Sequence, residues 1–431
     1  MARTGQSWGR WPTPVDQQLH PLRRRSEALP VGDRSLLAHG QGRSYGDSCL
    51  NDGGCLLLTR GLDHFLHFDA GAGVITCEAG VTLGELLEIA LPRGWFLPVT
   101  PGTRFATVGG ALANDVHGKN HHRAGSFGDH VLAFELVRSD GSPQVLRPGD
   151  PLFAATVGGL GLTGLVTWLQ LKLQRVAGPW MAVESIRFDG LDEFFALSEE
   201  SSGSHEYTVA WVDCLARGKA LGRGHFLRAN HAPAGSSGRL PGGGLPMPVT
   251  PPFALVNRLT LRPFNTLYYQ RQQARSRTGL QHYAPYFYPL DGIRDWNRMY
   301  GPRGFLQHQC VLPPAAARDA VAKLLGEIAR SGQGSFLAVL KEFGNRPAPG
   351  LLSFARPGTT LALDFPRAGQ ATFDLLDRLD AIVAEAGGAL YPAKDARMSP
   401  AMFRAGQPGL DRFLPHIDPA FSSSFWRRVM E

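Results

Sequence analysis

Short apolar runs separated by glycine fill the first part of the chain. Three of them have the length and composition of β-strands, namely residues 55–58, 74–77 and 165–169. Thr82, with Glu85 three residues further on, predicts a capping box that begins a short helix over residues 82–90. We therefore predict a mixed α+β region over residues 31–180.

The pattern changes after residue 180. Longer strands are predicted at residues 182–188, 207–212, 305–312, 336–343 and 360–365. Two helices are predicted over residues 314–331 and 373–386. The first has apolar side chains at helical spacing: Val321, Leu324, Leu325 and Ile328. This alternation predicts an antiparallel sheet covered on one face by helices.

The chain has 431 residues, and chains beyond about 250–300 residues usually divide into domains. Between residues 230 and 264, a Gly/Pro/Ser-rich stretch too flexible to pack precedes apolar residues that include Met247 and Phe253. This segment is either a linker followed by a core helix, or a mobile lid whose apolar residues touch lipid.

The bulk composition narrows the class of protein. A net charge of +7 favours partners that carry phosphate, such as a nucleotide cofactor, a phosphorylated substrate or an anionic membrane face. The basic residues are scattered, which argues against nucleic acid. The five cysteines have no CxxC spacing, which is typical of reduced thiols in a cytoplasmic protein. The N-terminus lacks the apolar segment of a signal peptide, and no run of about 20 apolar residues occurs.

Three glycine-rich regions lie near the ends of predicted strands. They read GQGRSYG at 40–46, PGTRFATVGGA at 101–111 with HGKNHH at 117–122, and TVGGLGLTG at 156–164. Glycine lets the backbone turn tightly and present successive N–H groups to an anion. The first region is not a GxGxxG that opens a helix, which disfavours a Rossmann fold. Three such regions in one domain suit a long, extended ligand such as FAD.

The histidines at 117, 121 and 122 raise zinc as an alternative, because His at i and i+4 share one face of a helix. No carboxylate or cysteine stands at ligand spacing, however, and Gly118 discourages a helix there. We predict no metal site.

These segments resemble the flavin domain of the vanillyl-alcohol-oxidase superfamily, which has the PCMH-type FAD-binding fold. Within it, the chain is most similar to the decaprenylphosphoryl-β-D-ribose 2′-oxidases, the flavoprotein half of a two-protein epimerase that makes the arabinose donor. The stretches specific to that branch are HGKNHHRAGSFGDH from His117, AWVD, NRMYGPRGFLQHQ, SFLAVLKEFG, LALDFP and LYPAKDAR. The resemblance extends from about Val31 to the end and is weakest in the loop after Asn230.

The resemblance implies a two-domain α+β fold. An FAD-binding domain would occupy residues 1–180. A substrate-binding domain with an antiparallel sheet would follow over 181–386 and contain the flexible loop at about 230–264. Residues 387–431 would return to the FAD-binding domain.

The family pattern also implies residue roles. FAD, bound non-covalently, would contact Gly40, Gln41, Gly42, Arg43, Ser44, Tyr45, Gly46, Gly102, Thr103, Thr107, Gly109, Gly110, Asn114, His117, Gly118, Val166 and Lys394. The proposed catalytic residues are His117, Lys394, Tyr391, Lys119, Gln307, Gln309 and Lys341. Substrate would contact Trp211, Phe287, Val339, Phe343, Thr360 and Ala362. A cation such as Lys394 near the N1–C2=O edge of flavin would stabilise the negative charge that this edge gains on accepting a hydride.

Without the family pattern, several of these residues have ordinary explanations. A lysine such as Lys394 in a strand-edge sequence is usually a solvated surface residue. Gln307 and Gln309 alternate along a strand and would then simply share one side of a sheet.

The chain departs from the family pattern at four positions. Arg43 stands where many superfamily members attach FAD covalently through a histidine. Ala362 stands where mycobacterial members have a pocket cysteine. Val209 and Phe287 stand where a small polar residue and a tyrosine are expected. These differences leave the exact sugar and lipid carrier open.

The implied activity is oxidation of a secondary hydroxyl of a sugar, namely the 2′-OH of polyprenyl-phosphoryl-β-D-ribofuranose, to the 2′-keto intermediate. The alternatives are a sugar, alditol or lactone oxidase, or a tailoring oxidase of glycan or antibiotic biosynthesis, on the same fold. A non-catalytic flavin-binding protein is disfavoured because His117 and Lys394 are both present. The implied partner is an NAD(P)H-dependent short-chain reductase. The expected location is the cytoplasm, with the apolar loop in peripheral contact with the inner membrane as an open alternative.

Overall fold

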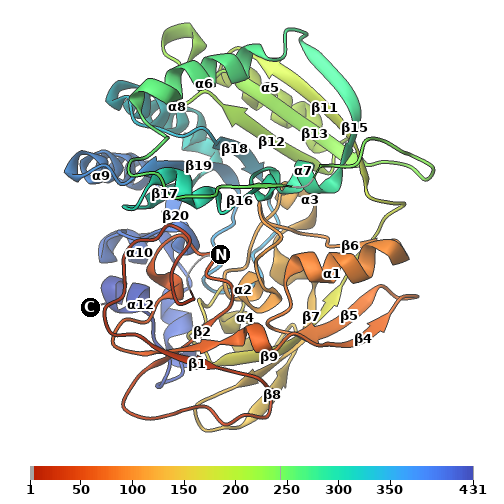
Figure 1. Cartoon of the computed structure of the whole chain (residues 1–431), viewed down its shortest axis with the longest axis vertical. Coiled ribbons are helices and arrows are strands. Elements are labelled where there is room, and N and C mark those ends of the chain that lie inside the picture. Colours follow the sequence, from red (N-terminus) through yellow and green to blue (C-terminus); the bar gives the residue numbers. More distant parts are fainter. Residues whose placement is uncertain (1–3, 243, 431) are drawn as a thin grey trace.

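The structure is a computed structural model that describes residues 4–242 and 244–430 (Figure 1). The predicted ranges 1–180, 181–386 and 387–431 therefore include residues 1–3, 243 and 431, which lie outside the described part. The predicted domain boundaries themselves stay a prediction.

A small parallel sheet and a five-stranded antiparallel sheet form the first part of the chain. The small sheet has the order β1-β3-β2, from Gln18–Pro21, Cys55–Leu58 and Leu36–His39. The larger sheet has the order β4-β5-β9-β7-β8, from Phe65–Asp69, Val74–Glu78, Leu165–Lys172, Val131–Val137 and Pro143–Leu146. A two-stranded pair, β6 and β10, joins Trp95–Phe96 to Gln174–Arg175.

Short helices pack on the five-stranded sheet, namely α1 (Leu83–Ala90), α2 (Val108–Ala113) and α4 (Pro151–Thr156). A further short helix, α3 (His121–Ala124), lies instead against Phe343, with the ring centroids of His121 and Phe343 4.6 Å apart. The predicted capping box is confirmed, because the Thr82 hydroxyl accepts from the Glu85 N–H at 3.2 Å and Glu85 Oε2 accepts from the Thr82 N–H at 2.7 Å. The apolar face of α1 then enters a core that includes Ile75, Phe134 and Leu169.

An eight-stranded sheet dominates the second part, in the order β15-β11-β13-β12-β18-β19-β17-β20. Its strands are Ser276–His282, Trp180–Phe188, Gly224–His231, Tyr207–Val212, Ala338–Phe343, Gly358–Pro366, Phe305–Leu312 and Ala389–Leu390. Neighbouring strands in this sheet pair antiparallel, as predicted.

Helices α5 (Leu191–Ser202), α8 (Pro314–Ser331) and α9 (Gln370–Glu385) cover one face of this sheet (Figure 1). The predicted helix over 314–331 is confirmed residue for residue, and the one predicted over 373–386 begins three residues earlier. Leu324 and Ile328 of α8 pack in one core with Phe226 and Leu340 from the strands. The opposite face of the sheet is left to form a cavity wall.

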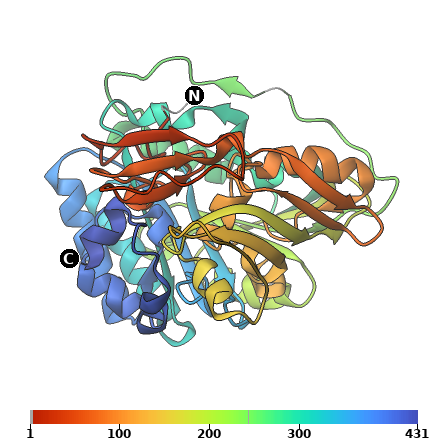
Figure 2. The same ribbon diagram turned by 90° about the horizontal axis from the view of Figure 1, so that it is seen from below.

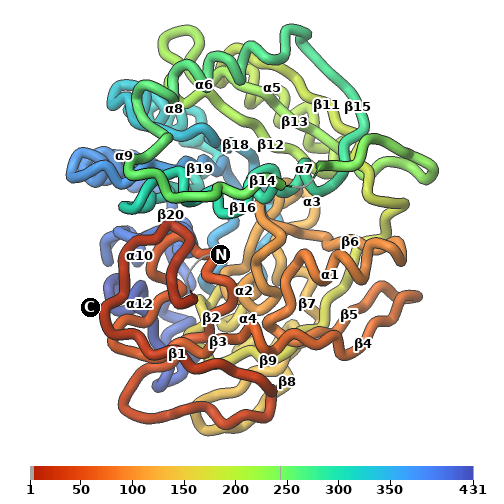
Figure 3. The backbone as a smooth tube through the Cα atoms, in the orientation of Figure 1, coloured from red at the N-terminus to blue at the C-terminus, as the bar shows by residue number. Residues whose placement is uncertain are grey.

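The segment at 230–264 combines features of both interpretations. It leaves β13 at His231, forms β14 (Leu245–Pro246) paired with β16 (Ile293–Arg294), and enters α6 (Arg258–Gln270). Figure 3 traces it around the outside of the molecule. Leu261 in α6 is buried, whereas Leu259 is 86% and Leu267 68% exposed. The helix therefore packs with one face and leaves leucines on the other uncovered.

The chain returns to its own beginning at the C-terminus. After β20 come α10 (Pro400–Gly406), α11 (Leu410–Phe413) and α12 (Ser424–Met430), which lie beside the N-terminal strands in Figure 2. Arg428 in α12 makes ion pairs with Asp47 and Asp395 at 2.8 and 2.9 Å. This clamp joins the turn after the first glycine region to the segment that follows Lys394.

Among the described residues, no helix combines the length and apolar character needed to cross a bilayer.

Candidate active site

A cavity of about 970 Å³ lies between the uncovered face of the eight-stranded sheet and the glycine-rich regions. Residues within 40–45, 100–103, 106–119 and 160–164 contribute to its wall, as do residues of β17, β18 and β19. Its volume lies at the upper end of the range for ligand sites, about 300–1,000 Å³. All three glycine regions of the sequence therefore meet at one cavity.

The first glycine region fits an extended dinucleotide. A Cβ on Gly40 would lie 2.4 Å from Thr107 Oγ1, and Gly42 has a φ of +58°, so neither position accepts a side chain without strain. Gly102 lines the cavity, and a Cβ there would project into open space. Its bare backbone therefore leaves room that a ligand can use.

Arg43 adds a cation to this wall. Its guanidinium lies 4.1 Å from the Trp8 ring centroid and 5.1 Å from that of Phe105, while its Nε is buried without a hydrogen-bond partner among the described residues. A diphosphate offers both the charge and the acceptor that such a guanidinium requires. The arrangement fits FAD bound through backbone N–H groups and one stacked arginine, and it contains no nucleophilic side chain at residue 43.

Nearly all of the residues predicted for the site line this cavity. They are Gly40, Gln41, Gly42, Arg43, Ser44, Tyr45, Gly102, Thr103, Thr107, Gly109, Gly110, Asn114, His117, Gly118, Lys119, Val166, Trp211, Phe287, Gln307, Gln309, Val339, Lys341, Thr360, Ala362, Tyr391 and Lys394. Two predicted residues lie outside the lining. Gly46 packs against the Asp395 carbonyl, and Phe343 lies behind His117 with ring centroids 4.8 Å apart. The roles of all these residues stay predictions.

His117 is held between two side chains from the sheet. Lys341 Nζ lies 2.8 Å from Nδ1 and also donates to the Gly118 carbonyl at 2.9 Å. Burial, with Lys341 as the next contribution, holds the pKa of His117 well below its usual range, so the ring is neutral. An amine aimed at Nδ1 makes that atom the acceptor, and Nε2 therefore carries the proton.

The other ring nitrogen faces Gln309. The two Nε2 atoms lie 2.9 Å apart, a contact that becomes a hydrogen bond when the amide presents its oxygen to the imidazole N–H. Gln309 also lies 3.3 Å from Thr360 Oγ1 on the neighbouring strand. The imidazole is thus fixed in one tautomer and one orientation at the cavity wall.

Three lysines share the cavity: Lys341 is buried, and Lys119 and Lys394 are half-buried. Burial lowers the pKa of Lys119, of Lys341 and of Lys394 to about 7 in each case, and for Lys341 the charges of the other two act in the same direction. Lys119 donates to the Tyr286 carbonyl and lies 4.4 Å from the Tyr286 ring centroid. Lys394 lies 3.6 Å from the ring centroid of Tyr45. An anionic ligand would favour their charged forms.

Asp364, to which the sequence analysis gave no role, places a carboxylate behind this wall. Asp364 Oδ1 accepts a hydrogen bond from Gln307 Nε2 at 2.6 Å, and the side chain is buried. Burial raises the pKa of Asp364 to about 7, and its attraction to Lys394 acts against the lowering of the lysine pKa. Asp364 lies in the LALDFP stretch, which the resemblance singled out without giving this residue a role.

Tyr391 and Trp211 are fixed by single hydrogen bonds. The Tyr391 hydroxyl donates to the Asn114 carbonyl at 3.0 Å, and its ring stacks on Phe354 with centroids 4.5 Å apart. The Trp211 indole N–H donates to the Phe336 carbonyl at 2.9 Å. Both rings therefore present fixed faces to the cavity.

The outer cavity contains residues that the sequence reading did not find. Tyr268 and Arg271, where α6 ends, and Arg277, on β15, belong to its lining. One signal was present in the sequence: no Asp or Glu occurs between Asp213 and Asp291. Such a stretch leaves its arginines without local acidic partners.

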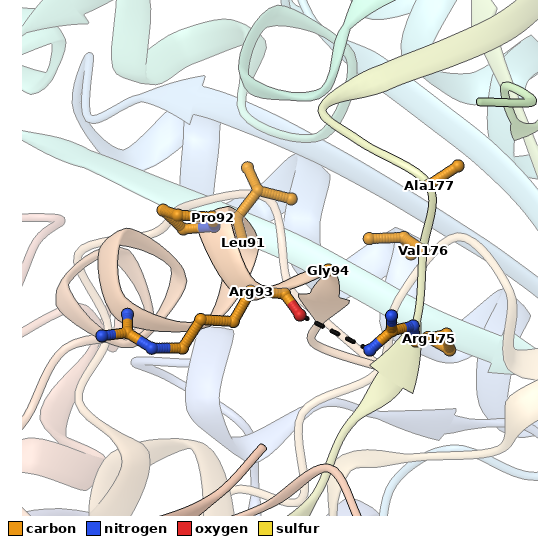
Figure 4. Close-up of a pocket in the computed structure, with 7 residues that line it drawn as sticks. All are labelled: Leu91, Pro92, Arg93, Gly94, Arg175, Val176 and Ala177. Carbon is orange, nitrogen blue, oxygen red and sulfur yellow. Dashed lines mark hydrogen bonds between the residues drawn. The ribbon is translucent and has the colours of Figure 1, made fainter. Parts of the chain in front are cut away.

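A second hollow, shown in Figure 4, has no comparable chemistry. It is lined by seven residues, among which the Arg93 carbonyl accepts from Arg175 at 3.5 Å. No group of three or more His, Cys, Asp or Glu residues that could hold a metal occurs in the part of the chain that the structure describes.

Comparisons with known proteins agree with the cavity. Residues 31–147 match the model of an FAD binding domain. The decaprenylphosphoryl-β-D-ribose oxidase of Mycolicibacterium smegmatis is 37% identical over 95% of this chain and 92% of its own length. An uncharacterised protein from the mprA 5′ region of Streptomyces coelicolor is 40% identical over 81% of this chain and its whole length. A probable L-gulonolactone oxidase of Arabidopsis thaliana is 35% identical over 28% of this chain and 22% of its own length.

Fold, cavity and domain match together make the chain an FAD-dependent oxidoreductase with the PCMH-type fold. Its identity to the mycobacterial enzyme over almost the full length is far more extensive than the partial match to the lactone oxidase. The chain belongs to the decaprenylphosphoryl-β-D-ribose oxidase family.

Proposed function

We propose that the chain oxidises the 2′-hydroxyl of a polyprenyl-phosphoryl-β-D-ribofuranose to a 2′-ketone. The observation that carries the proposal is the cluster of His117, Lys341 and Gln309 at the cavity wall, with hydrogen-bonding groups at 2.8 and 2.9 Å from the imidazole. The full-length similarity to a decaprenylphosphoryl-β-D-ribose oxidase supports the choice of sugar and carrier.

Bound FAD supplies the hydride acceptor for the carbon that bears the hydroxyl. The residues of the chain orient the sugar and accept the proton that its hydroxyl group loses. His117 fixes the amide of Gln309, whose NH2 group then remains free to donate to the sugar hydroxyls. Lys119 and Lys341 attract the phosphoryl group, because their charge is recovered when an anion enters. An amine with a pKa near 7 is also suited to accept the hydroxyl proton at neutral pH.

The same proposal includes two interactions outside the cavity. A ketone product that must become the epimeric alcohol requires a reductase, and we assign this step to an NAD(P)H-dependent short-chain reductase partner. The exposed apolar residues Leu245, Val249 and Phe253 would make peripheral contact with the inner membrane face, where a lipid-linked sugar resides.

Anaerobic bleaching of the flavin tests the activity. We expect polyprenyl-phosphoribose to reduce the flavin rapidly, and free alditols or L-gulonolactone to do so at least about 100-fold more slowly, because they lack both the phosphate and the chain. Faster bleaching by the lactone would favour the alternative suggested by the partial match to L-gulonolactone oxidase. Bleaching by none of these compounds would refute the proposed substrate.

A further inference from the structure

One face of the eight-stranded sheet forms a continuous floor under the cavity. Cross-strand partners connect it residue by residue. Gln309 on β17 pairs with Ala362 on β19, which pairs with Val339 on β18, which pairs with Trp211 on β12. All four residues line the cavity. This first part of the floor carries the groups described around His117.

The floor continues beyond Trp211 to the edge of the sheet. Val209 on β12 pairs with Leu227 on β13, Leu227 with Ser185 on β11, and Ser185 with Arg277 on the edge strand β15. Each of these residues also lines the cavity. Because side chains alternate between the faces of a strand, Val183 lies on the same face two residues from Ser185, and it too belongs to the lining.

The length of this floor decides what it can bind. Six strand spacings separate Gln309 from Arg277, and at about 4.8 Å each they span roughly 29 Å. A phosphate on the carbon next to the oxidised one lies only a few bonds from the reacting C–H. The phosphate therefore belongs at the polar end, and the remainder of the floor faces whatever chain follows it.

The chemistry of the floor changes along its length. Polar groups gather at the Gln309 end, and the middle is mainly apolar, with Val339, Trp211, Val209, Leu227 and Val183. Ser185 is the polar residue among them, and its hydroxyl donates to Gln272 Oε1 at 2.8 Å. Arg271 and Arg277 stand at the outer end. Arg271 stacks on Tyr268 with its guanidinium 3.8 Å from the ring centroid, and Leu267, one turn earlier, is 68% exposed.

We propose that the floor from Val339 to Val183 is a binding track for the polyisoprenoid chain of the substrate, and that the chain leaves between Arg271 and Arg277 beside the exposed leucines of α6. The inference rests on the proposed function, because it assumes a sugar carried on a lipid phosphate. A long apolar chain is the ligand that such a row of apolar side chains favours, through removal of apolar surface from water.

Equilibrium binding of polyprenyl phosphates without sugar tests the track directly. In the FAD-loaded wild-type protein we expect decaprenyl phosphate to bind at least about tenfold more tightly than geranyl phosphate, since the longer chain covers more of the floor. Both probes have the same phosphate, so the difference reports the chain alone. Equal affinities would overturn the proposal.

Val183→Trp places an indole across the middle of the track. It should weaken decaprenyl phosphate binding about tenfold and change geranyl phosphate binding less than about twofold. The matched control is Ala182→Trp, because Ala182 is exposed and its side chain points to the opposite face of β11. If Val183→Trp fails to retain FAD, Leu227→Ser tests the same step by removing apolar contact. Unchanged decaprenyl affinity in the variant that folds refutes the track.

Turnover distinguishes this inference from the proposed function. Oxidation of decaprenyl-phosphoribose with a KM unaffected by Val183→Trp and Leu227→Ser would sink the track and leave the activity standing. If the protein oxidises no lipid-linked ribose, yet binds polyprenyl phosphates according to chain length and the two variants weaken this binding, the track is supported and the proposed activity is refuted.

Discussion

Replacing Lys341 by methionine should change the free energy of unfolding by an amount that depends on pH, and should lower the activity at every pH. The lysine is buried, donates to His117 Nδ1 and to the Gly118 carbonyl, and has a pKa lowered from 10.5 to about 7. Methionine fills a similar volume without charge or donor. The variant therefore removes the burial of an amine together with two hydrogen bonds.

The sign follows from the direction of the pKa change. Between about pH 7 and 10.5 the unfolded state holds a proton on Lys341 that the folded state has lost, so this group makes wild-type stability rise with pH. The slope is up to about 1.4 kcal/mol per pH unit, or roughly 5 kcal/mol across the window. The two lost hydrogen bonds cost the variant about 2 kcal/mol at every pH. Lys341→Met should thus be more stable than wild type by roughly 3 kcal/mol near pH 7, and less stable by roughly 2 kcal/mol near pH 10.5.

The assay is denaturant unfolding of the FAD-loaded proteins at several pH values between 7 and 10.5, with Lys323→Met as the control. Lys323 is exposed and pairs with Glu385 on the surface, so its removal should give a difference that varies little with pH. Activity of Lys341→Met should fall about 100-fold throughout, because His117 loses the partner that fixes its tautomer. A stability difference between Lys341→Met and wild type that stays constant from pH 7 to 10 would refute the reasoning.

Three further outcomes are expected. Gly40→Ala brings a Cβ to 2.4 Å from Thr107 Oγ1 and should lower the FAD content of the purified protein about tenfold. Gly32→Ala is the control and should keep its FAD, because the new Cβ would meet nothing within 4 Å. Full flavin content in Gly40→Ala would contradict the proposed fit of FAD to this region. Acid precipitation should release all of the flavin into the supernatant, because Arg43 offers no nucleophile for a covalent link, and yellow pellets would show otherwise. The affinity for geranyl phosphate should fall as pH rises through about 7, because Lys119 and Lys341 lose their charge there. Lys119→Met should make the affinity depend less on pH. A wild-type affinity that does not change with pH would refute the binding of the phosphate by these lysines.

The sequence predicted local elements better than their long-range partners. The spacing of Val321, Leu324 and Ile328 is a local property, and α8 has the predicted bounds. The glycine regions were equally visible, because bare backbone at three places is a compositional signal. Asp364 could not be assigned in this way. It lies 57 positions after Gln307 in the sequence, and the two side chains meet because β17 pairs with β19. Arg271 likewise lines the cavity because of where α6 lies. The apolar pattern did not predict that position, since it fitted both a core helix and a mobile lid.

The clamp by Arg428 has a consequence for the order in which the flavin site is assembled. The wall around FAD uses backbone near residue 42 and the lysine at 394, and the Tyr45 N–H donates to the Ala393 carbonyl at 2.9 Å. Arg428 holds these two segments together, although it lies 381 positions after Asp47 in the sequence. During translation, the glycine-rich wall is therefore made long before the segment that completes it. FAD can meet both walls only after Arg428 has left the ribosome.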